Sequence, residues 1–306
     1  MKLRADHKEP SKMLVVAAFA AVYIIWGSTY VGIALAIKSV PPFLMAGLRF
    51  FAAGFILFIW CIIKGEKIPD LISVLKNSLA GILMLFCGTT ALIWSEQYLP
   101  SGLAAVIVAS VPFWFVILDK KHWKENFSSK FILIGLLIGF TGILLLFNGQ
   151  GAINLHSKVR LVAFIVLFTG SMLWSAGSLY SKYTTTNGNT TIKASIQMMA
   201  AGVTGFIAAL IAGEEHYFVW GNVTTSSINA MLYLILFGSL VGYIAYIWLL
   251  DVRPAALVGT YAYVNPAVAI FLGWLIDNEV ISVMQVIALI IILSGVLLIN
   301  FPKYKK

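Results

Sequence analysis

Long, nearly unbroken apolar segments follow one another along this 306-residue chain. A helix that crosses a bilayer needs about 20 mainly apolar residues. Apolar and polar residues do not alternate within these segments, as they would in a membrane-spanning strand barrel. We therefore expect an all-α integral membrane protein with ten transmembrane helices, at residues 13–37, 42–63, 79–99, 101–118, 131–147, 161–180, 192–212, 228–250, 254–276 and 283–300.

Two of these apolar stretches, residues 91–113 and 245–267, align without a gap at an offset of 154 residues, about half of the chain. They share Ala91/Ala245, Ile93/Ile247, Trp94/Trp248, Pro100/Pro254, Leu103/Leu257 and Pro112/Pro266. Each half would hold five helices, and because five is odd, the second half enters the membrane from the opposite side. The sequence thus predicts two inverted five-helix repeats, residues 13–147 and 161–300, an arrangement typical of secondary transporters.

Composition and charge support a membrane location. Hydrophobic residues make up 60% of the chain and charged residues 11%, against roughly 25% charged in soluble domains. If the amino terminus is cytoplasmic, 17 of the 21 Lys and Arg residues fall in cytoplasmic segments and three in outer loops, with Arg49 inside a span. This asymmetry predicts a multi-pass protein of the plasma (inner) membrane with both termini in the cytoplasm. The net charge of +9 then indicates the lipid bilayer as a partner, and no nucleic acid.

No enzyme, metal or cofactor signature is present in the sequence. Cys61 and Cys87 both fall in predicted spans, where a free cysteine behaves as a small hydrophobe. None of the four His residues lies in the middle of a span. The chain lacks a phosphate-binding glycine loop with its Lys, paired metal ligands, and a Ser–His–Asp set. We therefore expect neither catalysis nor a bound metal or cofactor.

Two charged residues lie clearly within the predicted spans, where charge is costly and usually functional. Arg49 lies about 10 Å below the outer end of the second segment, at 1.5 Å per residue. Glu96 lies about one turn below the outer end of the third segment. One interpretation is an outer charged pair for anion recognition or gating. The alternatives are a structural salt bridge, and a Glu96 that simply meets water at the outer surface.

Polar and aromatic residues also gather near the middle of three segments. Polar side chains in lipid prefer the bundle interior or a wet cavity. A pathway lined in this way suits a neutral or zwitterionic organic solute, although each residue could instead form interhelical hydrogen bonds without a ligand. The candidate pathway residues are Trp26, Thr29 and Tyr30 in the first segment, Trp174 and Ser178 in the sixth, and Tyr261, Tyr263 and Asn265 in the ninth.

Pro112 and Pro266 each fall about a dozen residues into the fourth and ninth segments. A proline removes one backbone donor and displaces the carbonyl four residues earlier, here at Val108 and Ala262. Matched positions in the two copies predict paired helix kinks at the repeat interface. These kinks either act as hinges or only shape a static packing.

The motifs YIIWGSTYVGIALA, PPFLMAGLRFFAAG, YLPSGLAAVIVASVPF and RPAALVGTYAYVNPAVAIFLGWLIDNE resemble the EamA family of the drug/metabolite transporter superfamily over nearly the whole chain. The resemblance implies a ten-helix inverted-repeat transporter, often an exporter of amino acids or other small metabolites. It also implies a central cavity bounded mainly by two four-helix cores, with the fifth and tenth helices peripheral. The family's glutamate before the last helix of each repeat matches Glu279 well. Glu125 matches it less well, because a basic run, DKKHWKE, precedes the fifth helix.

These observations favour a secondary-active transporter that moves a small organic solute, such as an amino acid, by alternating access. Export is the expected direction. The rival interpretations are a membrane channel and a non-transporting membrane scaffold. Saturation and counterflow would distinguish a transporter from a channel. The sequence leaves open the solute, any coupling ion, and whether the chain acts alone or as a homodimer.

Overall fold

A computed structural model describes residues 11–148, 157–277 and 282–300 of the chain. All regular elements in these ranges are helices, which confirms the expected all-α class. Three shorter apolar helices lie at Lys130–Gly139, Tyr261–Ile276 and Val286–Gly295. Seven longer helical stretches are apolar enough to cross a membrane: Lys12–Ala36, Pro42–Ile63, Leu71–Ser95, Ser101–Leu118, Lys158–Tyr183, Thr190–Ile211 and Thr225–Val252.

Two of the spans are composite helices with a π-helical middle. The first consists of α3 (Leu71–Gly81), η1 (Ile82–Thr90) and α4 (Ala91–Ser95). The second consists of α11 (Thr225–Tyr233), η5 (Leu234–Tyr243) and α12 (Ile244–Val252). π-Helical turns are rare and are frequently found at functional sites. They occur at corresponding places in the two halves of the chain.

The third span begins earlier than predicted, at Leu71 and not at residue 79. The Asp70 side chain caps this end, since its carboxylate accepts 3.2 Å from the backbone N–H of Ser73. Asn77 lies within the added turns, and its side-chain amide donates 2.8 Å to the carbonyl of Ser73. Polar residues whose hydrogen bonds are satisfied locally therefore lower the hydrophobicity of the first two turns of this helix, and the hydrophobic pattern did not predict these turns.

The segments predicted as the fourth and ninth spans are each interrupted, but not in the same way. The fourth divides into α5 (Ser101–Val108) and α6 (Val111–Leu118) directly before Pro112. The ninth divides into α13 (Ala255–Val258) and α14 (Tyr261–Asp277), and Pro266 lies inside α14. Only the first interruption therefore adjoins its proline.

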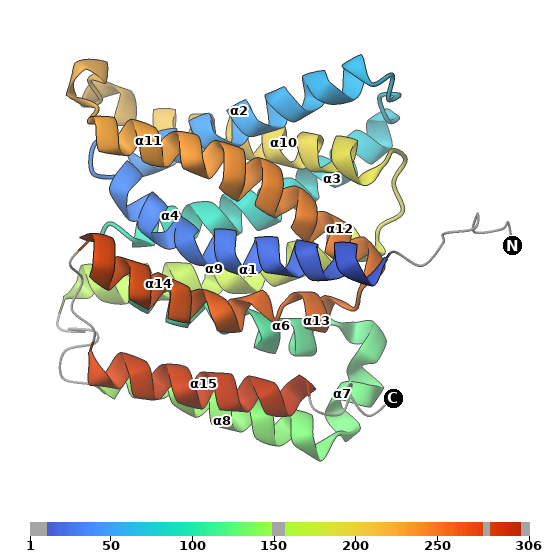
Figure 1. Cartoon of the computed structure of the whole chain (residues 1–306), viewed down its shortest axis with the longest axis vertical. Coiled ribbons are helices and arrows are strands. Elements are labelled where there is room, and N and C mark those ends of the chain that lie inside the picture. The colour runs from blue at the N-terminus through green and yellow to red at the C-terminus, as the bar shows by residue number, and fades with distance from the viewer. Residues whose placement is uncertain (1–10, 149–156, 278–281, 301–306) are drawn as a thin grey trace, which may run out of the picture.

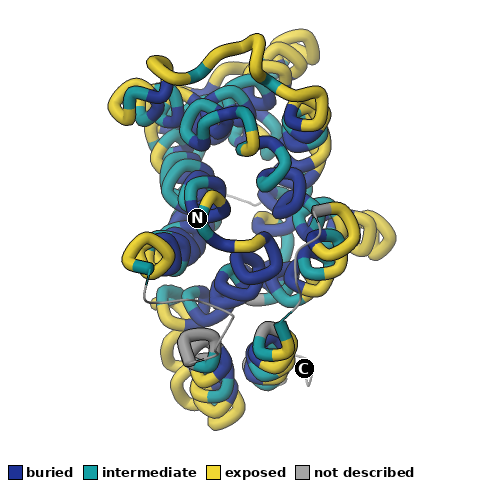
Figure 2. The backbone as a smooth tube through the Cα atoms, turned by 90° about the vertical axis from the view of Figure 1, so that its left-hand side faces the viewer, coloured by how far each residue is buried: buried dark blue, intermediate teal, exposed yellow. Residues whose placement is uncertain are grey.

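Helices α8 (Lys130–Asn148) and α15 (Val283–Asn300) pack against each other in a layer at one edge of the molecule (Figure 1). A Cβ atom added to Gly295 would lie 2.6 Å from both the carbonyl oxygen of Gly135 and the backbone nitrogen of Gly139. Glycine is therefore required for this close approach of the two backbones. Much of the outer face of this pair is exposed (Figure 2).

The remaining helices surround the molecular centre, with α1 (Lys12–Ala36) packed against α14, and α2 (Pro42–Ile63) against α10 (Thr190–Ile211). The short helix α7 (Trp123–Ser128) joins α6 to α8, and α9 (Lys158–Tyr183) opens the second half. Outward-facing apolar side chains are strongly exposed, among them Leu137 at 70% and Ile211 at 83%. Such a surface is unfavourable in water and fits a hydrocarbon surrounding.

Helices α2 and α10 end in the same way. A glycine in the left-handed region follows each helix, with φ of 76° at Gly65 and 68° at Gly213, and a glutamate comes next. The Glu214 carboxylate accepts hydrogen bonds from two backbone N–H groups in the first turn of α2. Glu66 accepts 2.5 Å from the side chain of Asn189, the residue that caps α10. Each helix thus ends in a glutamate that binds the start of the other.

Candidate functional site

A cavity of about 70 Å³ lies between the two halves of the chain. The first half contributes residues from α1, α2, η1 and α4 to α6, and the second half from α9, α10, η5 and α14. Neither α8 nor α15 contributes to the described lining. This volume has room for several water molecules. Both π-helical segments reach the cavity, η1 through Gly88 and Thr89, and η5 through Gly238 and Ser239.

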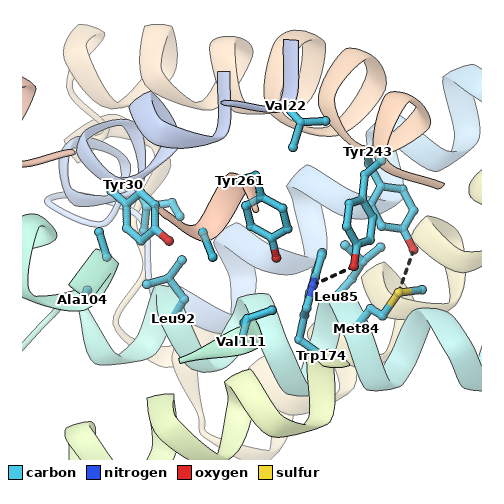
Figure 3. Close-up of a cluster of buried hydrophobic side chains, with 14 of the residues drawn as sticks. Val22, Tyr30, Met84, Leu85, Leu92, Ala104, Val111, Trp174, Tyr243 and Tyr261 are labelled. Atoms are coloured by element: carbon cyan, nitrogen blue, oxygen red, sulfur yellow. Dashed lines mark hydrogen bonds between the residues drawn. The ribbon is translucent and has the colours of Figure 1, made fainter. Parts of the chain in front are cut away.

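Aromatic rings from four helices gather at the cavity, and those of Trp26, Trp174 and Tyr261 line it. The Trp26 ring centroid lies 5.4 Å from that of Trp174 and 5.0 Å from that of Tyr261, both edge-to-face. Tyr246 lies 4.9 Å from Trp26 and 5.3 Å from Trp174, measured between ring centroids. We call Trp26, Trp174, Tyr246 and Tyr261 the aromatic cluster. Figure 3 shows Tyr261 next to Tyr30, both facing Leu92 and Val111 of the first half.

Hydrogen bonds fix the rings of the aromatic cluster. The Trp26 indole donates 3.0 Å to the carbonyl of Gly238 in η5. The Trp174 indole donates 3.1 Å to the Tyr246 hydroxyl, which also shares a 2.6 Å hydrogen bond with the Ser178 hydroxyl. Buried indole and phenol groups need such partners, and edge-to-face ring pairs add a modest stabilisation. The cluster is therefore a rigid wall that joins α1, α9, η5, α12 and α14.

Arg49 is the only charged side chain among the described residues that line the cavity. It is 4% exposed, and its Nε donates 3.0 Å to the Ser239 hydroxyl. A Cβ atom added to Gly238 would lie 2.9 Å from Nη2 of Arg49, so the glycine makes room for the guanidinium. Nη1 is buried and has no hydrogen-bond partner. The guanidinium is thus bound through Nε, and the N–H donors of Nη1 remain without acceptors.

Glu96 follows α4 and is 8% exposed. Its carboxylate lies within electrostatic range of Arg49, yet Glu96 is not among the described cavity-lining residues. The structure brings Arg49 to the central cavity together with the pathway residues, and its hydrogen-bonded partner there is Ser239. The functional pairing of Arg49 with Glu96 stays a prediction.

Asn265 and Thr29 complete the polar part of the lining. In the orientation that satisfies its surroundings, the Asn265 amide nitrogen donates 2.9 Å to the carbonyl of Tyr261 and 3.2 Å to that of Tyr23. The Thr29 hydroxyl donates 2.7 Å to the carbonyl of Trp26. The cavity therefore offers a few neutral polar groups and one cation in a mainly apolar and aromatic surrounding, a composition typical of small-molecule sites.

Sequence comparison matches residues 13–148 and 161–301 separately to the EamA-like transporter family, so both halves of the chain fit the same family. The chain belongs to this family. The predicted resemblance is thereby confirmed, and with it the assignment of the chain as a membrane transporter of the EamA type.

Curated relatives of this EamA-like protein carry transporter names. An uncharacterized inner membrane transporter of Escherichia coli K12, YedA, is 38% identical over 94% of this chain and 90% of its own length. A probable amino-acid metabolite efflux pump of the same strain is 23% identical, with 90% of each chain covered. A solved structure named "Crystal structure of protein" superposes with a TM-score of 0.68 at 15% identity, covering 96% of this chain and 99% of that one, which shows a shared fold.

Most of the predicted pathway residues meet at this cavity. Two do not line it. Ser178 lies behind the wall, because its hydroxyl is bonded to Tyr246 and to the carbonyl of Trp174. Tyr263 is half-buried on another face of α14. The predicted pathway residues that line the cavity are Trp26, Thr29, Tyr30, Trp174, Tyr261 and Asn265.

Of the two glutamates that the resemblance implies, one lies in a described helix and the other does not. Glu279 lies outside the described residues. Glu125 belongs to α7, the short helix before α8.

Several residues of the site were missed by the sequence analysis. Ser239 and Tyr243 lie four positions apart in η5 and both line the cavity. Thr89 does so from the corresponding segment, η1. A signal was available, since Gly88 with Thr89 and Gly238 with Ser239 are small-polar pairs in the middle of apolar spans. The π-helical turns that direct these pairs toward the cavity have no counterpart in the hydrophobic pattern of the sequence.

Proposed function

We propose that this EamA-like protein is a secondary-active transporter that carries small organic metabolites, such as amino acids, through the central cavity by alternating access, in the direction of export. The observation that carries the proposal is the cavity itself, which both halves of the chain line in nearly equal measure. Sites at the interface of two repeats are typical of transporters that rock one half against the other. The probable amino-acid efflux pump among the relatives supports the solute class and the direction.

The proposed architecture is ten transmembrane helices in two inverted repeats, residues 13–147 and 161–300, in the plasma membrane with both termini cytoplasmic. Seven long and three shorter apolar helices are compatible with it. The reciprocal binding of glutamates between α2 and α10 supports an inverted relation, because each glutamate lies at the opposite end of the helix pair from the other. The paired π-helical segments η1 and η5 support a repeated unit.

The test is counterflow of radiolabelled amino acids in proteoliposomes that contain the purified protein. A transporter should show saturable uptake that an internal pool of unlabelled solute accelerates. A channel should conduct without saturation and without acceleration by the internal pool. A scaffold should show no uptake of the labelled solute. The latter two results would each overturn the proposal.

Variants of the aromatic cluster link this activity to the cavity. Trp26→Ala and Trp174→Ala should reduce counterflow about 10-fold or more, since each removes a large apolar face from the wall. Suitable controls are Trp60→Ala on the exposed face of α2, and Leu137→Ala on α8 with Ile290→Ala on α15. Equal losses in the control set would place the pathway elsewhere.

A further inference from the structure

Arg49 is the one cation among the described residues that line the cavity, and Glu96, the carboxylate within its electrostatic range, lies outside that lining. A charge in a low-dielectric site is costly unless it is paired and hydrogen-bonded. The guanidinium carries five N–H donors in a fixed fork. One of them, on Nε, is bonded to Ser239, while Nη1 has no acceptor.

The surroundings of Arg49 shape a receptor for a compact oxyanion. The Ser239 hydroxyl accepts from Nε and so keeps its own proton for donation to a second acceptor. Gly238 lets Nη2 lie against the η5 backbone, where a Cβ atom would be only 2.9 Å away. Trp26 binds the carbonyl of the same Gly238, which keeps that acceptor occupied. Around Arg49, hydrogen-bond donors therefore outnumber the free acceptors.

We propose that Arg49, with the Ser239 hydroxyl, binds the carboxylate of the transported solute, and that Trp26, Trp174 and Tyr261 of the aromatic cluster contact its hydrocarbon part. This inference rests on the proposed function and names the chemical class of the solute: a small organic acid or amino acid with a free carboxylate. Charge-assisted hydrogen bonds from arginine to carboxylate are among the strongest available to a protein. The described lining holds no carboxylate, because Glu96, which lies within electrostatic range of Arg49, is outside it, so the cavity side of the guanidinium is open to a solute anion.

The pairing also decides which solutes are rejected. An amine without a carboxylate would bring a second positive charge close to Arg49, and like charges in a low-dielectric site repel. An amide would keep the shape of the solute but lose the charge. The site should therefore select an acid over its own amide, whatever the hydrocarbon attached to it.

Binding is measured on purified full-length protein in nanodiscs by ligand-induced thermal stabilisation and by titration calorimetry. The probes are three pairs of acid and amide on matched frameworks: leucine and leucinamide, phenylalanine and phenylalaninamide, and 4-methylpentanoate and 4-methylpentanamide. Wild type should bind at least one acid about 10- to 100-fold more tightly than its amide, the range expected for a hydrogen bond to a charged group. Equal binding of acid and amide, or no binding of any acid, would overturn the proposal.

Arg49→Gln should abolish the difference between acid and amide, and Arg49→Lys should restore part of it because the charge is retained. Ser239→Ala keeps the guanidinium and should weaken acid binding by a smaller factor. The matched control is Arg160→Gln at the exposed start of α9, which should leave the selectivity intact. Retention volume and helical content identify any variant that fails to fold. An unchanged preference in folded Arg49→Gln, or stabilisation of wild type by phenyl phosphate but by no carboxylate, would also overturn the site.

The proposed function and this site can fail separately. If proteoliposomes show no counterflow while acids still bind in an Arg49-dependent way, the transport proposal falls and the carboxylate site stands. If counterflow is saturable but equally fast for acids and amides, and in wild type and Arg49→Gln, the transporter stands and the site falls.

Discussion

Three charged side chains are buried among the described residues, and each is held differently. Glu214 is 2% exposed and binds two backbone N–H groups, those of Phe43 at 3.2 Å and Leu44 at 2.7 Å. These belong to the start of α2, where unpaired N–H groups and the helix dipole favour an anion. Arg49 has one hydrogen bond, to Ser239, and Glu96 lies within its electrostatic range. Glu214 therefore has a structural role, whereas Arg49 keeps N–H donors that are not used in the described structure.

Replacing Glu214 tests its structural role. Glu214→Ala leaves two N–H groups of α2 without acceptors and should lower stability by about 1–3 kcal/mol. Glu66→Ala is the matched control at the other end of the helix pair, and should cost less because Glu66 contacts a side chain and is less buried. Thermal unfolding in nanodiscs provides the comparison. Equal losses would mean that the cap at α2 adds nothing beyond a surface contact.

Glu214 should also make stability depend on pH. Burial raises the pKa of Glu214 above its ordinary 4.5, and the hydrogen bonds from Leu44 and Phe43 oppose this only in part. The folded state then holds its proton to a higher pH than the unfolded state does, so stability falls as pH rises through the folded pKa. The unfolding temperature of wild type relative to Glu214→Gln should therefore decrease between pH 4.5 and neutrality. An increase would show that the hydrogen bonds outweigh burial.

Asn265 should control which solutes are accepted. Both donors of its amide bind backbone carbonyls, those of Tyr261 and Tyr23, which leaves the amide oxygen as an acceptor at the cavity wall. Asn265→Ala should change the ranking of solutes in counterflow competition, whereas Trp26→Ala should weaken all of them. Folded protein with an unchanged ranking would contradict a role of Asn265 in selectivity.

At the scale of elements, the two π-helical segments carry the site. η5 binds Trp26 through the carbonyl of Gly238 and Arg49 through the hydroxyl of Ser239, so one short segment fixes α1 and α2 together. η1 holds Gly88 against Trp174 of α9, where a Cβ atom would lie 3.0 Å from that of the tryptophan. Widened turns thus place small residues where large side chains from the other half must approach.

Gly238→Ala tests this arrangement. The added Cβ would lie 2.9 Å from Nη2 of Arg49 and 3.1 Å from Cγ2 of Thr29, so the guanidinium must move. Transport should fall about 10-fold or more, while the protein remains folded because a side chain, and not backbone, yields. Gly221→Ala is the control, since nothing lies within 4 Å of its added Cβ. Normal transport by Gly238→Ala would show that the position of Arg49 is unimportant.

At the scale of the whole molecule, the chain divides into a central bundle around the cavity and the peripheral pair α8 and α15 (Figure 1). Figure 1 shows the start of α1, helix α7 and the end of α15 on one side, and the connection from α10 to α11 on the opposite side. The charge asymmetry of the sequence predicts that the first side is cytoplasmic.

Single cysteines in a background without Cys61 and Cys87 test the orientation. Lys121→Cys should be protected from an impermeant thiol reagent on intact cells, and Lys158→Cys and Tyr217→Cys should be labelled. Tyr217 is 64% exposed and therefore accessible to the reagent. Glu214 is buried, so a cysteine at that position would not be labelled even if it lay on the outer side. Labelling of Lys121→Cys without labelling of the other two would reverse the proposed topology.

The sequence by itself determined the helical class, the family, and six of the residues that line the cavity. It could do so because bilayer thickness sets the length of an apolar helix, and because polar residues in the middle of such a helix must face inward. Only the tertiary structure decided the rest. Arg49 lies at the cavity with its Nε bonded to Ser239 of η5, which is 190 positions away in the sequence. Ser178 does not line the cavity, because its hydroxyl is bonded to Tyr246. Such placements depend on π-helical turns and on contacts between the two halves, and a periodic pattern along one chain encodes neither.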